Sequence, residues 1–169
     1  MPEDFLRIAA TIAPAGTTSV PRGVRRAPWP AVAIETGDPI ARVPEIAAAL
    51  AATVGSVAVV APGPEHDALA ASGADLRDAE AAGRLSGGID LLGLAAVKGL
   101  EFDAVVVVEP ARILAERPDG GPGGLYTALT RSTRALAIVH AEPLPAALAA
   151  APDLRHIAPA GVSGWLSGR

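Results

Sequence analysis

Val97-Lys98-Gly99-Leu100-Glu101-Phe102-Asp103 leads directly into an apolar run, Ala104 to Val108, that contains four consecutive valines. Because the run is apolar at every position, it predicts a strand that is buried on both faces, as in a parallel sheet covered by helices. Lys98 is the only lysine of the chain. Charged residues and a glycine next to a buried strand indicate a site at the edge of a sheet.

Short β-branched runs alternate with helically spaced apolar residues along the rest of the chain. The predicted strands are Ala31 to Glu35, Ser56 to Val60, Ile89 to Val97, Ala104 to Glu109 and Ala135 to His140. The predicted helices are Phe5 to Ile12, Pro44 to Val54, Glu65 to Ala71, Asp75 to Ala82, Pro110 to Ala115, Leu125 to Arg134 and residues 143–149. This alternation predicts an α/β fold with a mainly parallel central sheet.

The length of the chain predicts a single domain over residues 1–169. Residues 1–30 are expected to form an N-terminal helix followed by an irregular connector rich in Pro, Gly and Arg. Residues 152–169 are expected to be an irregular tail that Trp165 docks onto the body. The glycine-rich stretch Asp119 to Gly124 is interpreted as a mobile linker.

The composition excludes several classes of protein. The formal net charge is −4, so the chain lacks the basic surface that is typical of a stand-alone nucleic-acid binder. Its tightest basic cluster, Arg22, Arg25 and Arg26, is interpreted as a solvated loop. The absence of cysteine excludes disulfides and Cys-based metal sites and fits a cytoplasmic protein. No signal peptide or apolar stretch of membrane-spanning length is present, so we expect no membrane contact.

The segment from Lys98 to Asp103 has side chains suited to a nucleotide. Gly99 allows a ligand to approach the backbone closely, or the chain to adopt a positive φ. Glu101 can accept hydrogen bonds from a ribose hydroxyl, and Lys98 can meet a carboxylate or a phosphate. The alternative is a plain solvated turn before a strand, in which Lys98 and Glu101 are surface charges.

The predicted helix from Leu125 to Arg134 carries a second candidate. At 100° per residue, its apolar residues share one face and Arg131 points away from them. An arginine presented outside its own core can stabilise charge on a transferring phosphoryl group. The alternative is an exposed arginine with no such role.

These two segments resemble signature motifs of superfamily 1 helicases of the UvrD/Rep and HelD type. Val97 to Val105 is similar to motif V, and Leu125 to Arg131 is similar to motif VI. The resemblance is strong over residues 90–140. It implies a RecA-like three-layer fold and the second, C-terminal motor domain of an ATP-dependent helicase or translocase.

The resemblance also assigns roles to individual residues. It makes Arg131 the catalytic arginine finger that contacts the γ-phosphate of ATP, and it makes Glu101 the contact to the nucleotide sugar. Lys98 and Gly99 match the motif and are placed on the nucleotide side. The implied cofactor is ATP with Mg²⁺, held mainly by a phosphate-loop RecA-like domain of the same full-length protein.

One departure from motif V concerns the macromolecular partner. The helicase motif often has Thr and His shortly before its lysine, on the nucleic-acid side, whereas this chain reads Leu94-Ala95-Ala96-Val97. The departure favours the HelD branch, which acts on RNA polymerase, and the Ala- and Arg-rich composition is similar to that of actinobacteria. DNA or RNA polymerase is therefore the expected partner of the intact protein.

Several motifs are missing. The sequence contains no G-x-x-x-x-G-K-[ST] phosphate loop and no Asp-Glu box for Mg²⁺, so we expect half of a motor that is inactive alone. His66, His140 and His156 lack metal-type spacing and are interpreted as surface or core residues. The rival hypothesis is a non-catalytic, helicase-like interaction module that docks RNA polymerase or another partner. A third hypothesis is a small stand-alone nucleotide-binding enzyme. The missing phosphate loop makes this hypothesis the weakest of the three.

Overall fold

A seven-stranded sheet in the order β3-β4-β2-β5-β6-β1-β7 forms the centre of the molecule, and every pair of neighbouring strands is parallel. The computed structural model describes residues 1–17, 23, 25–82 and 88–168. The expected α/β fold with a parallel sheet is confirmed. The strands are β1 (Ala31–Glu35), β2 (Val57–Val60), β3 (Arg77–Asp78), β4 (Ile89–Leu92), β5 (Phe102–Val108), β6 (Ser132–His140) and β7 (Leu154–Ile157).

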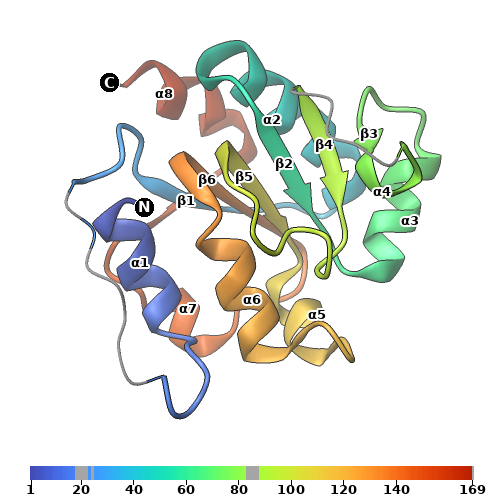
Figure 1. The fold of residues 1–169 in the computed structure, drawn as a ribbon. Coiled ribbons are helices and arrows are strands. Elements are labelled where there is room, and N and C mark those ends of the chain that lie inside the picture. Colours follow the sequence, from blue (N-terminus) through green and yellow to red (C-terminus); the bar gives the residue numbers. More distant parts are fainter. Residues whose placement is uncertain (18–22, 24, 83–87, 169) are drawn as a thin grey trace.

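Helices cover both faces of the sheet and make a three-layer molecule (Figure 1). One core cluster joins the sheet to α1, α5, α6 and α7, and a second joins the opposite face to α2, α3 and α8. The helices are α1 (Glu3–Ala10), α2 (Pro39–Val54), α3 (Gly63–Ala71), α4 (Ala79–Ala82), α5 (Pro110–Ala115), α6 (Gly121–Leu129), α7 (Ala146–Ala149) and α8 (Val162–Ser167). Strand β5 is buried at six of its seven positions, as its unbroken apolar sequence predicts.

Helix α2 begins earlier than its sequence suggested. We expected Pro44 in the first turn, but the helix begins at Pro39, and Pro44 lies inside it. The Asp38 side chain accepts a hydrogen bond from the backbone N–H of Ala41 at 3.1 Å. Such a cap satisfies one of the free donors of the first turn, so it fixes the start of the helix one turn ahead of Pro44.

Two further boundaries differ from the prediction. The strand expected over Ile89 to Val97 ends at Leu92, and the chain then turns. The helix expected over Asp75 to Ala82 is replaced at its start by β3, which pairs with β4 at the edge of the sheet. The break expected at Gly87-Gly88 falls partly on residue 87, which lies outside the described residues.

Glycines between Asp119 and Gly124 belong to a tight helical connection, so the mobile linker predicted there is wrong. Helix α6 begins at Gly121, within that stretch. A Cβ atom at Gly120 would lie 2.3 Å from the carbonyl oxygen of Ile113, and one at Gly124 would lie 2.4 Å from that of Asp119. Glycine is needed here because the backbones of α5, the turn and α6 approach closely.

The C-terminal segment is ordered, so the irregular tail predicted for residues 152–169 is wrong. It adds β7 to the edge of the sheet and continues through a 3₁₀ turn, Pro159–Gly161, into α8. The predicted docking by Trp165 is confirmed, since its indole N–H donates to the carbonyl oxygen of Pro30 at 2.9 Å. At the N-terminus, the predicted helix is present as α1. Of the connector after it, residues 18–22 and 24 lie outside the described part.

No helix among the described residues is long and apolar enough to cross a membrane.

Candidate functional site

The register between β5 and β6 brings the two motif segments together. Phe102 and Ser132, the first residues of these neighbouring parallel strands, are paired. The backbone N–H of Phe102 donates to the carbonyl oxygen of Arg131 at 3.0 Å. Neighbouring strands lie about 4.8 Å apart. Glu101 and Arg131, each one residue ahead of its strand, therefore lie side by side at the amino edge of the sheet.

Arg131 does not lie on a helix, so that part of the prediction is wrong. Helix α6 ends at Leu129, and β6 begins at Ser132. At this end of the helix the Thr130 hydroxyl bonds back to the carbonyl oxygens of Tyr126 and Thr127, at 3.0 and 3.1 Å. Threonine competes in this way with helix continuation.

The last turn of α6 holds the Arg131 guanidinium at the surface. The Nε–H of Arg131 donates to the carbonyl oxygen of Thr127, and Nη2 donates to the Thr130 hydroxyl, both at 3.2 Å. Arg131 is half-buried and belongs to neither core cluster. The sequence predicted that Arg131 points away from the core, and the structure agrees. The sequence also predicted that it lies on a helix, whereas it lies in a turn.

Lys98, Gly99 and Glu101 are exposed in the segment that leads into β5. Gly99 has φ +77°, a left-handed conformation that favours glycine. Apart from its chain neighbours, no heavy atom of the described residues lies within 4 Å of where its Cβ would be. The Lys98 ammonium lies 3.9 Å from a carboxylate oxygen of Asp119, in the turn that precedes α6. The segment is anchored from below by Leu94 and Val97, which are buried in the core beside α6.

Two other charged residues near this edge hold the fold together. The Asp103 carboxylate accepts hydrogen bonds from the backbone N–H and the hydroxyl of Ser56, at 3.0 and 2.9 Å. Arg134 was expected on the helix beside Arg131, but it lies in β6. It donates to the carbonyl oxygen of Val54 at 2.7 Å, and its guanidinium lies 5.3 Å from the centre of the Trp29 ring.

Carboxylates of the chain itself occupy the amide groups at the opposite, carboxyl edge. Parallel α/β sheets commonly bind phosphates at this edge, through helix N-termini. Here Asp38 caps α2, and the Glu116 carboxylate accepts a hydrogen bond from the N–H of Gly63 at the start of α3, at 2.7 Å. These donors are therefore already paired with negative charge.

The Glu109 carboxylate also binds backbone amides at the carboxyl edge, between the ends of β5 and β6. It is 2 % exposed and has φ 50°, which is the one positive φ of a non-glycine residue in the described chain. Its carboxylate accepts hydrogen bonds from the backbone N–H groups of Ala141 and Glu142. The sequence analysis missed Glu109; its place directly after the buried valine run, before a proline, was the available signal.

Arg112 joins three elements at the carboxyl edge. Its guanidinium donates to the carboxylates of Glu142, at 2.7 Å, and of Glu65. These hydrogen bonds, with that to Glu142 the larger cause, raise the pKa of Arg112 above its ordinary value. The guanidinium therefore stays charged at every working pH, and two carboxylates share it.

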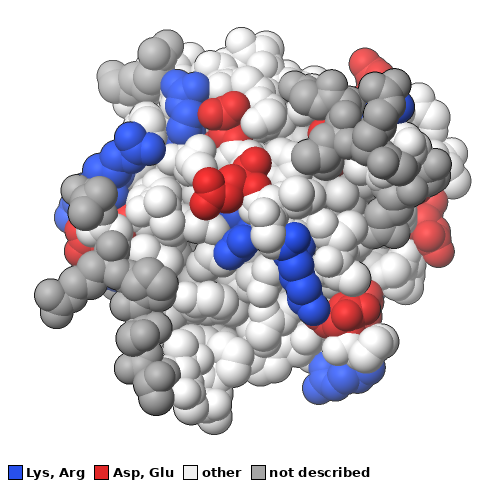
Figure 2. All heavy atoms as spheres, viewed as in Figure 1, with Lys and Arg blue, Asp and Glu red and all other residues white. Residues whose placement is uncertain are grey.

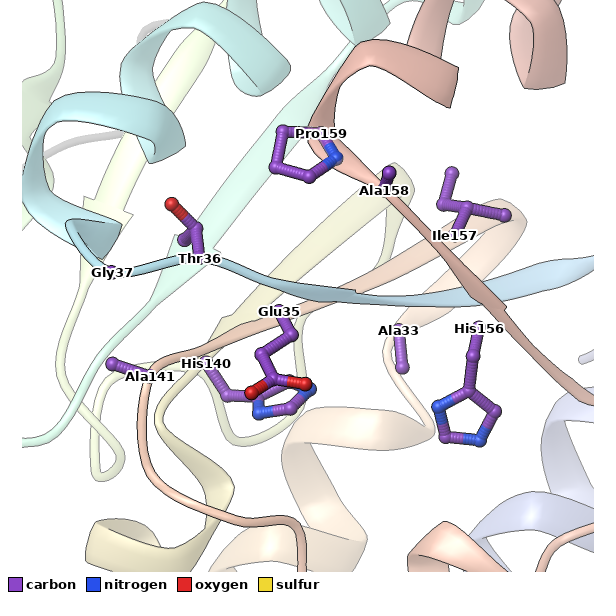
Figure 3. Close-up of a pocket in the computed structure, with 10 residues that line it drawn as sticks. All are labelled: Ala33, Glu35, Thr36, Gly37, His140, Ala141, His156, Ile157, Ala158 and Pro159. Atoms are coloured by element: carbon purple, nitrogen blue, oxygen red, sulfur yellow. The ribbon is translucent and has the colours of Figure 1, made fainter.

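A pocket of about 570 Å³ lies at the carboxyl ends of β1, β6 and β7 (Figure 3). A second pocket of about 360 Å³ lies beside it, between the starts of α2, α3 and α5. Neither was predicted from the sequence, because each combines residues from three or more separate segments. Among the described residues, no cluster of three His, Asp or Glu side chains could hold a metal ion.

The face that carries α1 and α6 has no continuous basic area among the described residues. Figure 2 shows basic and acidic side chains interspersed on a largely uncharged surface. Of the predicted arginine cluster, Arg25 and Arg26 are exposed, as expected of a solvated loop, and Arg22 lies outside the described residues.

Comparison with solved structures identifies the fold. The chain superposes on the C-terminal domain of a possible DNA helicase from Lactobacillus plantarum WCFS1 with a TM-score of 0.66 and 20% identity, covering 91% of this chain and 95% of that one. The chain has the RecA-like fold of helicase C-terminal domains. An arterivirus nonstructural protein 10 (helicase) in complex with DNA aligns with a TM-score of 0.48 and 16% identity, over 92% of this chain and 37% of that one. No family model and no curated protein sequence matches the chain.

Proposed function

We propose that the chain is the second RecA-like motor domain of an ATP-dependent helicase or translocase of the UvrD/HelD type. The observation that carries the proposal is the pairing of Phe102 with Ser132, which places Glu101 and Arg131, the residues directly before them, at the same sheet edge. Two segments picked out by their resemblance to motifs V and VI, about thirty residues apart, thus meet at one edge of the sheet. The RecA-like fold agrees with this assignment.

Each residue has a task in this proposal. Arg131 reaches the γ-phosphate of ATP across a cleft and stabilises the charge that develops during phosphoryl transfer. Glu101 accepts hydrogen bonds from the nucleotide sugar. Lys98 and Gly99 complete the nucleotide side, where an exposed cation and a glycine without near neighbours leave room for a ligand.

The hydrogen bonds at the carboxyl edge support a nucleotide site that is shared between two domains. A phosphate-binding domain needs free amide donors at its helix N-termini. In this chain Asp38 and Glu116 occupy such donors at the starts of α2 and α3, and Glu109 occupies amides of the loop after β6. The triphosphate and its Mg²⁺ would therefore be held by a phosphate-loop domain of the same full-length protein, and this chain would contribute from its amino edge.

Substitution of Arg131 in a protein that carries both domains tests the proposal. Loss of an arginine finger lowers turnover by about 10³ to 10⁵. We expect Arg131→Ala to lower the turnover number by that factor and to leave the fold intact. Arg155→Ala is the matched control, because Arg155 is an exposed arginine of β7 at the far edge of the sheet. Near-normal turnover of Arg131→Ala would refute the assignment.

A second test uses the chain alone. Because it lacks a phosphate loop, a clean preparation of these 169 residues should hydrolyse no ATP. An ATPase signal that co-purifies with the chain and disappears with Arg131→Ala would contradict the shared site.

A non-catalytic interaction module that docks RNA polymerase is the second candidate. Leu94 and Val97 favour it, because positions where the helicase motif places side chains for nucleic acid are buried in the core here. The two candidates differ in one measurement. A full-length protein with an intact phosphate loop that hydrolyses ATP supports the motor, and one that lacks turnover supports the module.

A further inference from the structure

The two pockets at the carboxyl edge adjoin each other. They share Gly37 and Ala141, which lie just beyond the ends of β1 and β6. The chain leaves β1 toward α2 on one face of the sheet, and it leaves β6 toward α7 on the other. Crevices of this kind, where consecutive connections diverge, are the usual ligand sites of open parallel sheets. The name carboxyl groove is used below for the residues that line these two pockets.

Two buried acceptor atoms in the carboxyl groove lack a donor among the described residues. One is Oε2 of Glu65, whose other oxygen is paired with Arg112. The second is Nε2 of His140. The Nδ1 of His140 lies 2.8 Å from the carbonyl oxygen of Glu142, so in the neutral ring Nδ1 carries the proton and Nε2 is an acceptor. Both residues are only 5 % exposed.

Unpaired buried acceptors are costly, so they indicate what the groove is built to receive. A buried polar atom without a partner costs roughly 1–3 kcal/mol. Both atoms have almost no accessible surface, so an N–H donor from a ligand removes this cost only when the side chain turns toward the groove. A ligand that brings only acceptors, such as a phosphate group, would not remove it.

The charged residues around the groove also favour a ligand with N–H donors over a phosphate group. Glu35 is exposed and lines the first pocket next to His140, with which it is paired across β1 and β6 (Figure 3). The second pocket is lined by Glu65, Glu109 and one cation, Arg112, which already contacts Glu65 and Glu142. Carboxylates thus outnumber cations along the groove, so its potential attracts positive charge.

We propose that the carboxyl groove binds a partner protein through a segment that carries arginine or lysine side chains. Guanidinium and ammonium groups supply several N–H donors each and match the excess of carboxylates. The groove extends over two adjoining pockets, which suits neighbouring side chains of one extended segment. This proposal concerns the edge opposite Glu101 and Arg131, so it is independent of the nucleotide site.

A nucleic-acid strand is the competing occupant, and the same contacts argue against it. Phosphate would meet the exposed carboxylate of Glu35 and would lie near the buried carboxylates of Glu65 and Glu109. The amide donors that could hold it, at Ala41, Gly63 and Ala141, already bind carboxylates of the chain. The positive charge that drives nucleic-acid binding is missing from this edge.

A fluorescein-labelled peptide of alternating arginine and serine tests the proposal on the 169-residue chain. We expect saturable binding by fluorescence anisotropy that weakens as salt screens the charges. In amide NMR spectra, the signals of Gly37 and Ala141, which the two pockets share, should shift on titration. A labelled single-stranded oligonucleotide should leave both signals in place.

Charge-neutral variants locate the contact. Glu35→Gln changes an exposed side chain and should fold normally, and together with Glu65→Gln it should weaken peptide binding by at least about tenfold. Asp75→Asn is the control, since it removes one exposed carboxylate ahead of β3, far from the groove. Equal binding by Glu35→Gln, Asp75→Asn and the unmodified chain would overturn the proposal. So would shifts at Gly37 and Ala141 with the oligonucleotide alone.

Discussion

The backbone N–H of Phe102 donates a 3.0 Å hydrogen bond to the carbonyl oxygen of Arg131, so the first residue of β5 is tied to the turn that leads into β6. This bond fixes the backbone of Arg131 beside the start of β5. The arginine is thus positioned by the sheet register and by the last turn of α6 together. Both supports are short and local, which makes the position of the guanidinium sensitive to single side chains.

Thr130 is expected to be a positioning residue for Arg131. Its hydroxyl accepts a hydrogen bond from Nη2 of Arg131 and donates to the carbonyl oxygen of Tyr126. Thr130→Val removes that acceptor, and a misplaced catalytic group costs up to about 10² in rate. We expect the turnover number of the intact protein to fall by roughly tenfold or more with little change in KM.

Rescue and a matched control separate positioning from stability. Thr130→Ser keeps the hydroxyl and should restore turnover. Thr133→Val removes a neighbouring hydroxyl that bonds the carbonyl oxygen of Phe102 and does not contact Arg131. If Thr133→Val lowers turnover as much as Thr130→Val does, the effect is a general loosening of this edge and the positioning role is wrong.

Asp103 is predicted to serve stability, although it belongs to the segment that resembles motif V. Its carboxylate bonds the N–H and hydroxyl of Ser56, and its own N–H donates to the Ser56 hydroxyl at 3.1 Å. Asp103→Ala leaves the Ser56 N–H without its partner, which should lower the free energy of unfolding by about 1–3 kcal/mol.

A double-mutant cycle with Ser56→Ala isolates the interaction. Contacting residues couple by about 0.5–3 kcal/mol, so the two substitutions together should cost less than their sum. Urea unfolding of the four proteins measures this coupling. Strict additivity would show that the two residues act separately.

The fold class could be predicted because residue types within short stretches of the sequence specify the individual strands. The apolar run of β5 and the boundaries of β1 follow directly from residue type, and the structure confirms both. The end of α6 could not be predicted in the same way. Leu125 to Arg134 continues a helical pattern, but the helix ends at Leu129 and the chain enters β6 at Ser132, which pairs with the distant Phe102.

The part of the candidate sites that was not predicted depends on contacts between residues far apart in the sequence. Lys98, Gly99, Glu101 and Arg131 could be predicted as candidates because each lies in a recognisable segment. The carboxyl groove depends on contacts such as that of Glu109 with Ala141 and Glu142, more than thirty residues later. The local pattern at Glu109 does not specify such a contact. An acidic residue before a proline is common, and its positive φ becomes visible only in the fold.

The two tryptophans are expected to fasten the C-terminal segment to the sheet. The indole N–H of Trp29 donates to the carbonyl oxygen of Leu166 at 3.1 Å, and that of Trp165 donates to Pro30. Trp29 is 1 % exposed, so Trp29→Ala should cost about 3–5 kcal/mol in unfolding free energy. Trp165→Phe removes one hydrogen bond of a half-buried ring and should cost about 1 kcal/mol.

Fluorescence provides the measurement for this pair. In Trp165→Phe the remaining indole is Trp29, so its emission reports directly on the junction between the chain before β1 and α8. Removal of residues 154–169 should expose Trp29 to water and lower the melting temperature. An unchanged melting temperature would mean that this segment adds nothing to the core.

Glu101 offers a prediction that separates sugar contact from phosphate chemistry. If its carboxylate accepts a hydrogen bond from a ribose hydroxyl, Glu101→Gln weakens a charge-assisted bond, worth about 1.5–3 kcal/mol, that is present before and during the reaction. A contact that is equally strong in both states changes KM and leaves the turnover number unchanged. In the intact protein we therefore expect KM for ATP to rise about tenfold or more at constant turnover number. Arg131→Ala should do the reverse.

Nucleotide analogues identify the hydroxyl. The unmodified protein should bind either 2′-deoxy-ATP or 3′-deoxy-ATP more weakly than ATP, and Glu101→Gln should lose most of that difference. Lys98→Gln is the comparison from the same segment, because it removes the other charge of the nucleotide side and keeps the carboxylate. Equal discrimination by Glu101→Gln and the unmodified protein would place the sugar elsewhere. The side-by-side position of Glu101 and Arg131 would then reflect only the register of β5 and β6.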